Sequence, residues 1–292
     1  MDLWNAIARH ISEASGESFR PQSKHSVGGG CINKAYRFDG GNRQYFVKTN
    51  RDEYVHMFEA EKRALSEIAD SQTVRVPLPL CCGEYGDTCY LVMEFLDLSG
   101  RANMAQLGEQ LATMHQITRP DYGWDIDNTI GSTPQPNEPS SDWIEFWREH
   151  RLGFQLQLAA KNGHFGQLQD LGEELLEIFP ALFGNTAPPA SMLHGDLWGG
   201  NCAAQADGTP VIFDPALYYG DREADIAMSR LFGGFGPDFY AAYNSAWPME
   251  AGHEIRSTFY NLYHILNHLN LFGSSYYHQA IDMMRRLQSE LR

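Results

Sequence analysis

The chain has 292 residues, of which 43% are hydrophobic and 20% charged, so it can bury a sizeable core in one large domain or two lobes. Its formal net charge of -15 repels the phosphate backbone, and we expect no nucleic-acid partner. No stretch reaches the roughly 20 apolar residues of a membrane span and the N-terminus lacks a secretory signal, so a cytoplasmic protein without a membrane partner is expected.

The first third of the chain is predicted to be rich in strands. Leu3, Ile7 and Ile11 repeat at helical spacing before a stop at Gly16, which indicates an opening helix. Alternating and β-branched runs on either side of a glycine-rich turn indicate a hairpin. The predicted elements are a helix over 3–15, strands over 35–38 and 45–48, a helix over 54–69 and a strand over 88–95.

The remainder is predicted to be mostly helical. Helical patterns cover 103–117, a segment opening at 142, 167–179, 221–232, 254–271 and the stretch to 291, and the only expected strand there is 210–213. Asp142 with Glu145 three residues later is typical of a capping box, and the long loop 121–140 suggests a function. This order predicts an α+β, bilobal protein. The expected lobes are a small sheet-rich one over 1–96 and a larger helical one over 97–292, with ligands between them.

The most informative segment contains Asp196, Asn201 and Asp214. The first two have the D-x-x-x-x-N spacing of a phosphoryl-transfer catalytic loop, and Asp214 follows a hydrophobic strand. A carboxylate can orient an acceptor hydroxyl and take its proton, while the oxygens of Asn201 and Asp214 suit Mg²⁺. Each residue alone could equally be a turn or cap residue, but the three in this order favour the kinase reading.

Two further residues match a phosphate-positioning ion pair. Lys48 ends the strand over 45–48, where a kinase lysine contacts the α- and β-phosphates of ATP. Its carboxylate partner would be Glu59 or Glu61 on the next helix. Glu61 shares the buried face with Phe58, so we choose Glu61, although its side chain could also extend to the edge of that face.

The adenine and phosphate contacts have weaker signals. Gly28, Gly29 and Gly30 precede the first hairpin strand, where backbone N–H groups could cover phosphates, although an isolated glycine run is more often a flexible turn. Met93, Glu94 and Phe95 end the apolar strand and could form an adenine-binding hinge or an ordinary core strand.

These segments resemble the fructosamine/ketosamine-3-kinase family, a branch of the protein-kinase-like superfamily related to aminoglycoside and choline kinases. The similarity runs nearly end to end, and the run His194 to Asn201, H-G-D-L-W-G-G-N, is its most specific part. The other matching segments are 28–36, 46–48, 57–61, 123–125, 128–131, 134–137, 213–216 and 221–223.

The resemblance implies ATP-dependent phosphorylation of the 3-hydroxyl of a ketosamine, the adduct of a sugar with an amine. The adduct would derive from ribulose, erythrulose or fructose and would be a small molecule or protein-bound, and its 3-phosphate would release the amine in deglycation. By the same resemblance, Asp196 is the general base, Asn201 and Asp214 bind magnesium, and Lys48 with Glu61 positions the phosphates. The sequence carries no signal for an oligomeric state.

Further roles are expected for three residues near the predicted site. Trp198 beside the base could pack against the sugar or only buttress its loop. Asp225 is expected to hydrogen-bond the backbone of the catalytic loop. Cys31 could be a redox-sensitive thiol stabilised by phosphate-binding amides, whereas the odd number of cysteines without metal-site spacing favours free thiols in general.

Two alternatives remain open on the sequence. One is a kinase for another small alcohol or amine, such as an aminoglycoside or choline. The other is a pseudokinase that only binds nucleotide, which the presence of Lys48, Asp196, Asn201 and Asp214 disfavours.

Overall fold

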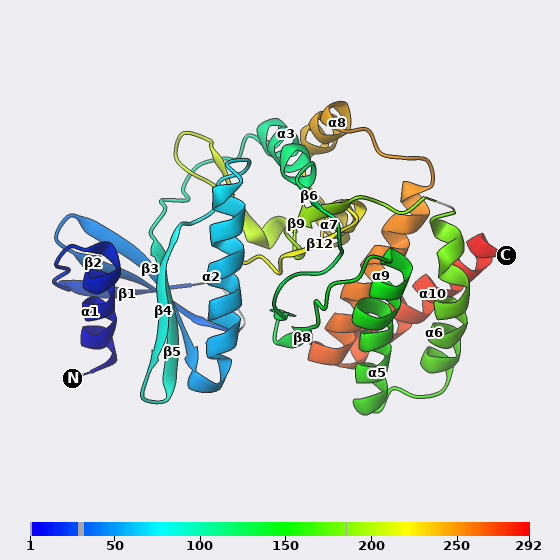
Figure 1. Cartoon of the computed structure of the whole chain (residues 1–292), viewed down its shortest axis with the longest axis horizontal. Coiled ribbons are helices and arrows are strands. Elements are labelled where there is room, and N and C mark those ends of the chain that lie inside the picture. The colour runs from blue at the N-terminus through cyan, green and yellow to red at the C-terminus, as the bar shows by residue number, and fades with distance from the viewer. Residues whose placement is uncertain (1, 29–31, 185) are drawn as a thin grey trace. The chain divides into compact units, whose positions relative to one another are not determined.

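The computed structural model describes residues 2–28, 32–184 and 186–292. Gly29, Gly30 and Cys31, which were expected in the phosphate loop, lie outside the described residues. The chain forms two compact units, Met1–Asn103 with Cys202–Pro215, and Met104–Asn201 with Ala216–Arg292 (Figure 1). The first unit thus extends past residue 96 and includes a segment from late in the sequence.

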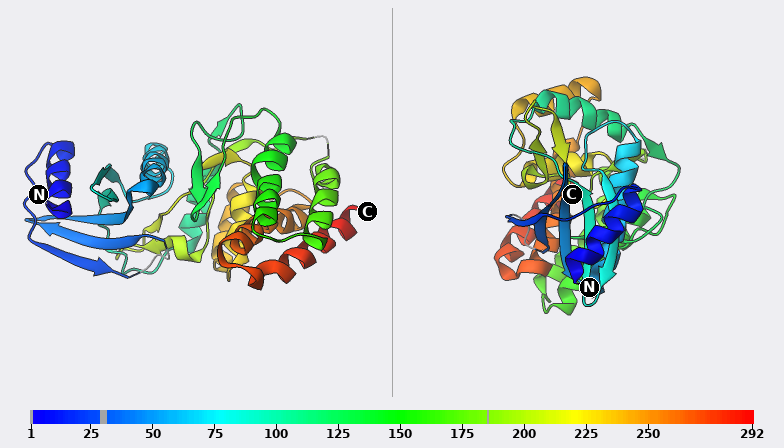
Figure 2. Two further views of the ribbon diagram at one scale, coloured as in Figure 1. Left: turned by 90° about the horizontal axis from the view of Figure 1, so that it is seen from below. Right: turned by 90° about the vertical axis from the view of Figure 1, so that its left-hand side faces the viewer.

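The first unit is built on a five-stranded antiparallel sheet of order β1-β2-β3-β5-β4. Its strands are β1 (Ser23–Val27), β2 (Lys34–Gly40), β3 (Arg43–Arg51), β4 (Pro79–Tyr85) and β5 (Thr88–Glu94), its helices are α1 (Leu3–Ser15) and α2 (Val55–Asp70), and the late segment adds the hairpin β10 (Cys202–Ala204) and β11 (Pro210–Ile212). Figures 1 and 2 show strands β3 to β5 running between α1 and α2. The two helices therefore cover opposite faces of the sheet.

Helix α1 forms where the sequence predicted it, because both of its ends are capped. The Asp2 side chain accepts the N–H of Asn5, and Gly16 takes the left-handed conformation that ends the helix. Ile7 and Ile11 are fully buried against Phe38, which confirms the predicted apolar stripe. Burying two such side chains stabilises the unit by about 1.5–3 kcal/mol each.

The second unit is mainly helical. Its helices are α3 (Met104–His115), α4 (Trp143–Trp147), α5 (Gly153–Lys161), α6 (Gln167–Ile178), α7 (Glu223–Leu231), α8 (Pro237–Ala246), α9 (His253–Phe272) and α10 (Tyr277–Leu291). Its strands are β6 (Thr118–Arg119), β7 (Asn128–Ile130), β8 (Thr133–Gln135), β9 (Ala190–Leu193) and β12 (Tyr218–Gly220), which form a three-stranded sheet of order β12-β9-β6 and the hairpin β7–β8.

Helix α9 is the centre of this unit. It packs against α5, α7 and α10 (Figure 1), and its residues from Phe259 to Leu266 are all buried. Trp147 lies edge-on to Tyr260, with ring centroids 4.9 Å apart. A helix whose middle is buried on nearly every side needs such neighbours all round, which explains its position.

Several short elements differ from the sequence expectation. The expectation of a single strand in the second part of the chain is wrong, because β9 and β12 pair there and β7 and β8 form a hairpin within the predicted loop 121–140. Helices α5 and α8 and strands β1 and β4 were not predicted. The capping box at Asp142 is half right: Asp142 accepts the N–H groups of Ile144 and Glu145, but its own N–H donates to Ser140.

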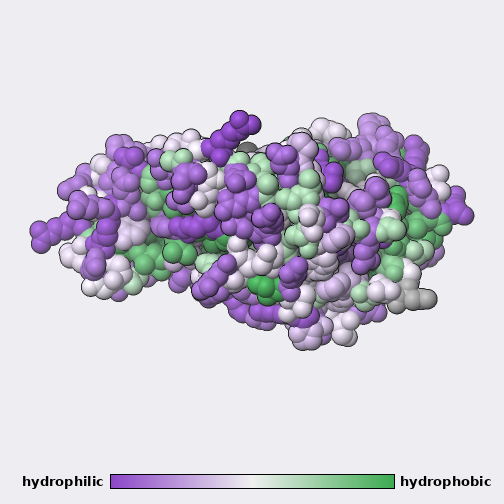
Figure 3. Space-filling model, turned by 90° about the horizontal axis from the view of Figure 1, so that it is seen from above, coloured by the Kyte–Doolittle hydropathy of each residue, from purple (hydrophilic) through white to green (hydrophobic). Residues whose placement is uncertain are grey.

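Figure 3 shows hydrophilic residues over most of the face drawn, interrupted by small hydrophobic patches. Across the described ranges, none of the helices combines the length and hydropathy that a membrane crossing requires.

Candidate active site

Lys48 lies on β3 and reaches α2. Its neighbour Val47 packs into the core against α1, and since side chains alternate along a strand, Lys48 projects from the opposite face. Its Nζ is 2.5 Å from Glu61 Oε1 and 2.6 Å from Asp214 Oδ1. The structure thus joins three expected site residues, and the partner on α2 is Glu61, as chosen from the helical face.

The Lys48–Glu61 pair is largely buried, and both groups have shifted pKa values. The Lys48 side chain is 8% exposed and that of Glu61 is 12% exposed. Burial alone would lower the pKa of Lys48, but the carboxylates of Asp214 and Glu61 outweigh it and raise the pKa of the ammonium above its ordinary value. Burial also raises the pKa of Glu61, against the opposing effect of Lys48. The cluster is a fixed cation between two carboxylates.

Asp214 follows β11 in a strained conformation. Its φ is 58°, in the left-handed region that few residues other than glycine adopt. Such strain is retained at functional sites where the surroundings impose it. Two residues before Asp214, the N–H of Ile212 donates to Arg75 O at 3.0 Å, which fixes the end of β11. The Asp214 side chain is 46% exposed, so a carboxylate oxygen remains accessible beside the one that Lys48 binds.

The expected hinge is part of the sheet. Met93 is buried on β5, the N–H of Glu94 donates to Leu78 O at 2.9 Å, and the N–H of Phe95 donates to Gln44 O at 3.4 Å. Neither N–H is available to an adenine ring while those bonds persist. Gly28 is exposed just after β1, with open space where a Cβ would stand.

The expected catalytic loop, from His194 to Asn201, begins where β9 ends. At Gly195, φ is 82° and an added Cβ would stand 2.0 Å from Ala216 O, so only glycine fits this turn. The N–H of Ala216 donates to His194 O at 2.8 Å. The loop is therefore fastened to the backbone just after the Asp214–Pro215 pair.

Asp196 and Asn201 contact each other across the loop. The Asn201 Nδ2 donates to the backbone oxygen of Asp196 at 2.9 Å and to its Oδ2 at 3.1 Å. Because the amide nitrogen is used in this way, Oδ1 is the atom that Asn201 can offer to a metal. The structure thus brings together the expected base and one expected metal ligand within the second unit.

Trp198 covers its own loop. A Cβ on Gly200 would stand 2.3 Å from the Trp198 ring, and the ring meets Phe232 edge-on with centroids 6.0 Å apart. The side chain is nevertheless exposed. These contacts give Trp198 the buttressing position, and its exposed edge leaves the sugar contact as a prediction.

Asp225 accepts hydrogen bonds from the backbone of the loop, as expected. Its Oδ2 accepts the N–H of His194 at 2.7 Å and its Oδ1 accepts the N–H of Gly195 at 2.8 Å. His115, which was not predicted from the sequence, also belongs here, because its Nε2 lies 3.1 Å from the same Oδ2. No local pattern marks His115, because its partner lies 110 residues away.

The β7–β8 hairpin also supports the backbone at Ala216 and Leu217, a role that was not predicted from the sequence. Gln135 Nε2 donates to Ala216 O at 3.1 Å, and Asn128 Nδ2 donates to Leu217 O at 2.8 Å. Both residues belong to segments that carry the family resemblance. Their burial and their bonds give these segments a structural role.

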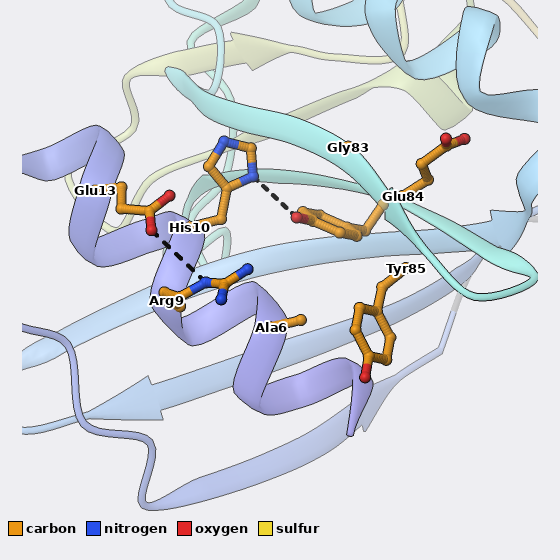
Figure 4. Close-up of a pocket in the computed structure, with 8 residues that line it drawn as sticks. Ala6, Arg9, His10, Glu13, Gly83, Glu84 and Tyr85 are labelled. Atoms are coloured by element: carbon orange, nitrogen blue, oxygen red, sulfur yellow. Dashed lines mark hydrogen bonds and ion pairs between the residues drawn. The ribbon is translucent and has the colours of Figure 1, made fainter. Parts of the chain in front are cut away.

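One hollow of about 260 Å³ lies elsewhere in the first unit, between α1, β4 and β5 (Figure 4). Within it, His10 Nδ1 is 2.9 Å from the Tyr90 hydroxyl, and Arg9 pairs with Glu13. None of the expected site residues lines it. Among the described residues, no three His, Cys, Asp or Glu side chains gather into a metal-binding cluster.

Sequence comparisons found relatives that match most of this chain. A protein-ribulosamine 3-kinase of Arabidopsis thaliana, chloroplastic by name, is 47% identical over 263 residues, which cover 89% of this chain and 80% of the relative. A Synechocystis protein assigned as a ketoamine kinase is 46% identical over 287 residues, covering 97% and 96%.

Solved structures give the same result. A Haemophilus somnus protein assigned as a fructosamine-3-kinase has a TM-score of 0.89 at 32% identity, with 97% of each chain covered. A choline kinase from Streptococcus pneumoniae, at 14% identity and a TM-score of 0.61, shares the fold, which is protein-kinase-like as the sequence predicted. Because the fructosamine kinase family model matches residues 3–290, the chain belongs to the fructosamine kinase family.

Proposed function

We propose that this protein transfers the γ-phosphoryl group of ATP to the 3-hydroxyl of ketosamines. The acceptors are ribulose-, erythrulose- or fructose-derived adducts of lysine or other amines, free or attached to proteins. The products are ketosamine 3-phosphates and ADP, and release of the amine from the phosphate accomplishes deglycation. Support comes from the family and from relatives named as ketoamine and ribulosamine kinases.

Asp196 is the general base in this proposal. Its carboxylate orients the 3-hydroxyl and takes the proton as the oxygen bonds to the γ-phosphorus and the bond to ADP breaks. Asn201 fixes one carboxylate oxygen, Oδ2, through its amide N–H. Trp198, two residues further along the chain, would contact the sugar.

In this proposal, residues of the first unit bind the nucleotide. Lys48, held by Glu61, positions the α- and β-phosphates, and the backbone at Gly28 to Gly30 covers them. Met93 to Phe95 lie beside the adenine. The observation that carries this assignment is the bond of Lys48 to both Glu61 and Asp214, the latter 166 residues away in the sequence.

The donor set fits magnesium. Mg²⁺ is bound by few protein oxygens together with phosphate oxygens, and the available atoms are the Asn201 Oδ1 and an accessible carboxylate oxygen of Asp214. When bound, the ion neutralises charge on the β- and γ-phosphates. Lys48 would then share Asp214 with the metal.

A panel assay tests this function. ADP release is followed with ATP, Mg²⁺ and ribuloselysine, fructoselysine, choline or kanamycin as acceptor. The proposal expects turnover with the ketosamines and none above background with the other two. Faster turnover of choline or kanamycin, or ADP release that ignores the acceptor, would contradict it.

A reducing compartment, such as the cytoplasm, is part of the proposal. Cys81, Cys82, Cys89 and Cys202 are all free thiols. Burial raises the pKa of Cys81 to about 12 and that of Cys202 to about 11, so these thiols are poorly reactive.

A further inference from the structure

A chain of buried polar side chains ends on the Asp225 carboxylate. It joins α8, α3 and α7, and each member is at most 5% exposed. Arg222 Nη1 is 3.2 Å from the Tyr243 hydroxyl, which is 2.8 Å from His115 Nδ1. His115 Nε2 is 3.1 Å from Asp225 Oδ2.

The chemistry of the members allows only one direction for these bonds. Arg222 can only donate, and an ionised Asp225 can only accept. Burial lowers the pKa of His115, so its imidazole is neutral, with one donor and one acceptor nitrogen. Burial raises the pKa of Tyr243, so its hydroxyl keeps a proton to donate. His115 Nε2–H must therefore donate to Asp225, while its Nδ1 accepts from Tyr243.

Asp225 is the point where this chain meets the catalytic loop. Its two oxygens accept three N–H groups, from His115, His194 and Gly195. Burial alone would raise the pKa of Asp225, but these donors hold it below its ordinary value. The Asp196 N–H in turn donates to His194 Nδ1 at 3.2 Å, so the position of Asp196 depends on the residues that Asp225 anchors.

We infer that His115 is a positioning residue. Tyr243 selects its Nε2–H tautomer, and this N–H donates a hydrogen bond to Asp225 that keeps Asp225 in place as an anchor of the catalytic loop. The inference rests on the proposed function, because its kinetic effect is expressed through Asp196. It does not depend on which ketosamine is the acceptor. No residue proposed for nucleotide binding belongs to this series of hydrogen-bonded side chains.

The kinetic test compares His115→Phe, which keeps the ring volume but donates nothing, with His115→Gln, whose amide can still donate to Asp225. Loss of one donor to a buried carboxylate predicts a fall in kcat of about 10- to 100-fold for His115→Phe, with KM for ATP within about twofold. His115→Gln should recover kcat to within about fivefold of the unaltered enzyme. Tyr243→Phe should give an intermediate loss.

A matched control separates positioning from general destabilisation. Tyr122 is also buried and donates its hydroxyl to Pro188 O at 2.6 Å, without touching Asp225. Tyr122→Phe therefore removes a comparable bond, and its kcat should stay within about twofold of the unaltered value. An equal loss in Tyr122→Phe and Tyr243→Phe would overturn the inference.

The pH profile gives a second readout. In His115→Phe the pKa of Asp225 should rise, so the acid limb of kcat should move to higher pH. The titratable and charged groups around Asp225 are His115, His194, Tyr218, Arg222, Tyr243 and His264. Of these, His264 is neutral, because burial lowers its pKa to about 3. An unmoved acid limb would contradict the role of His115.

A spectroscopic measurement on the unaltered protein needs no substrate. Nitrogen-15 NMR of labelled histidine should show His115 as the neutral Nε2–H tautomer between pH 6 and 8, and Tyr243→Phe should weaken that preference. The Nδ1–H tautomer would refute the inference even if the variants fail to fold. If the tautomer is right and ketosamines are not phosphorylated, the proposed function fails instead.

Discussion

Replacing Glu61 by glutamine removes one of the two carboxylates that hold Lys48. Glutamine keeps the shape and one acceptor oxygen, so the change is mainly electrostatic. Lys48 is buried and would remain charged, with Asp214 as its only carboxylate partner. Its ammonium should then lie closer to Asp214 and farther from the position that α- and β-phosphates require.

The magnitude follows from the bond that is weakened. A hydrogen bond to a charged group contributes about 1.5–3 kcal/mol, which corresponds to about 10- to 150-fold in kcat/KM. Breaking a buried pair outright costs about 3–5 kcal/mol of stability. The loss of folding stability should be smaller than that, because Asp214 still neutralises Lys48.

Glu59 supplies the control. It lies on the same helix and is exposed, so Glu59→Gln changes the net charge equally without touching Lys48. The assay measures kcat and KM for ATP, together with urea unfolding, for both variants. The reasoning is refuted if the two variants have the same kcat/KM for ATP, within about twofold.

Two other predictions concern the catalytic loop and the helix that supports it. Gly200→Ala should lower kcat by about tenfold or more, because its Cβ would strike the Trp198 ring, whereas Gly199→Ala faces open space and should be nearly neutral; equal activities would contradict this. Burial and the neighbouring Glu223 raise the pKa of Asp221 to about 7, so the folded state holds a proton that an unfolded carboxyl, with a pKa of about 3.9, has released. Stability should therefore fall as pH rises from about 4 to 7, and urea midpoints of Asp221→Asn should depend less on pH; an identical slope in both proteins would exclude Asp221 as the cause.

The sequence alone predicted the parts of the site that rest on local periodicity. Glu61 was separable from Glu59 because a helix of 3.6 residues per turn places it with Phe58 on the buried face. Asp196 and Asn201 were recognisable because a loop of fixed length joins them. The long helices were predicted for the same reason, since their apolar stripes repeat over several turns.

Other features depend on distant pairing, which a single sequence does not display. Strands such as β1 and β9 have only 5 and 4 residues, too few for alternation to be diagnostic, and they exist because partner strands bond to them. The β1 residues are mostly exposed, so no apolar pattern marks them. The contact between His115 and Asp225 spans 110 residues, and only the fold brings the two together.

The role of Asp196 tests the account most directly. Ribuloselysine and ATP are incubated with the unaltered protein and with Asp196→Asn, the phosphorylated product is measured by phosphorus-31 NMR, and ATP binding is measured by calorimetry. We expect a ketosamine 3-phosphate from the unaltered protein and a loss of about a thousandfold or more in the variant, with ATP binding retained. Near-normal turnover in Asp196→Asn, or a phosphate on another hydroxyl, would contradict the account.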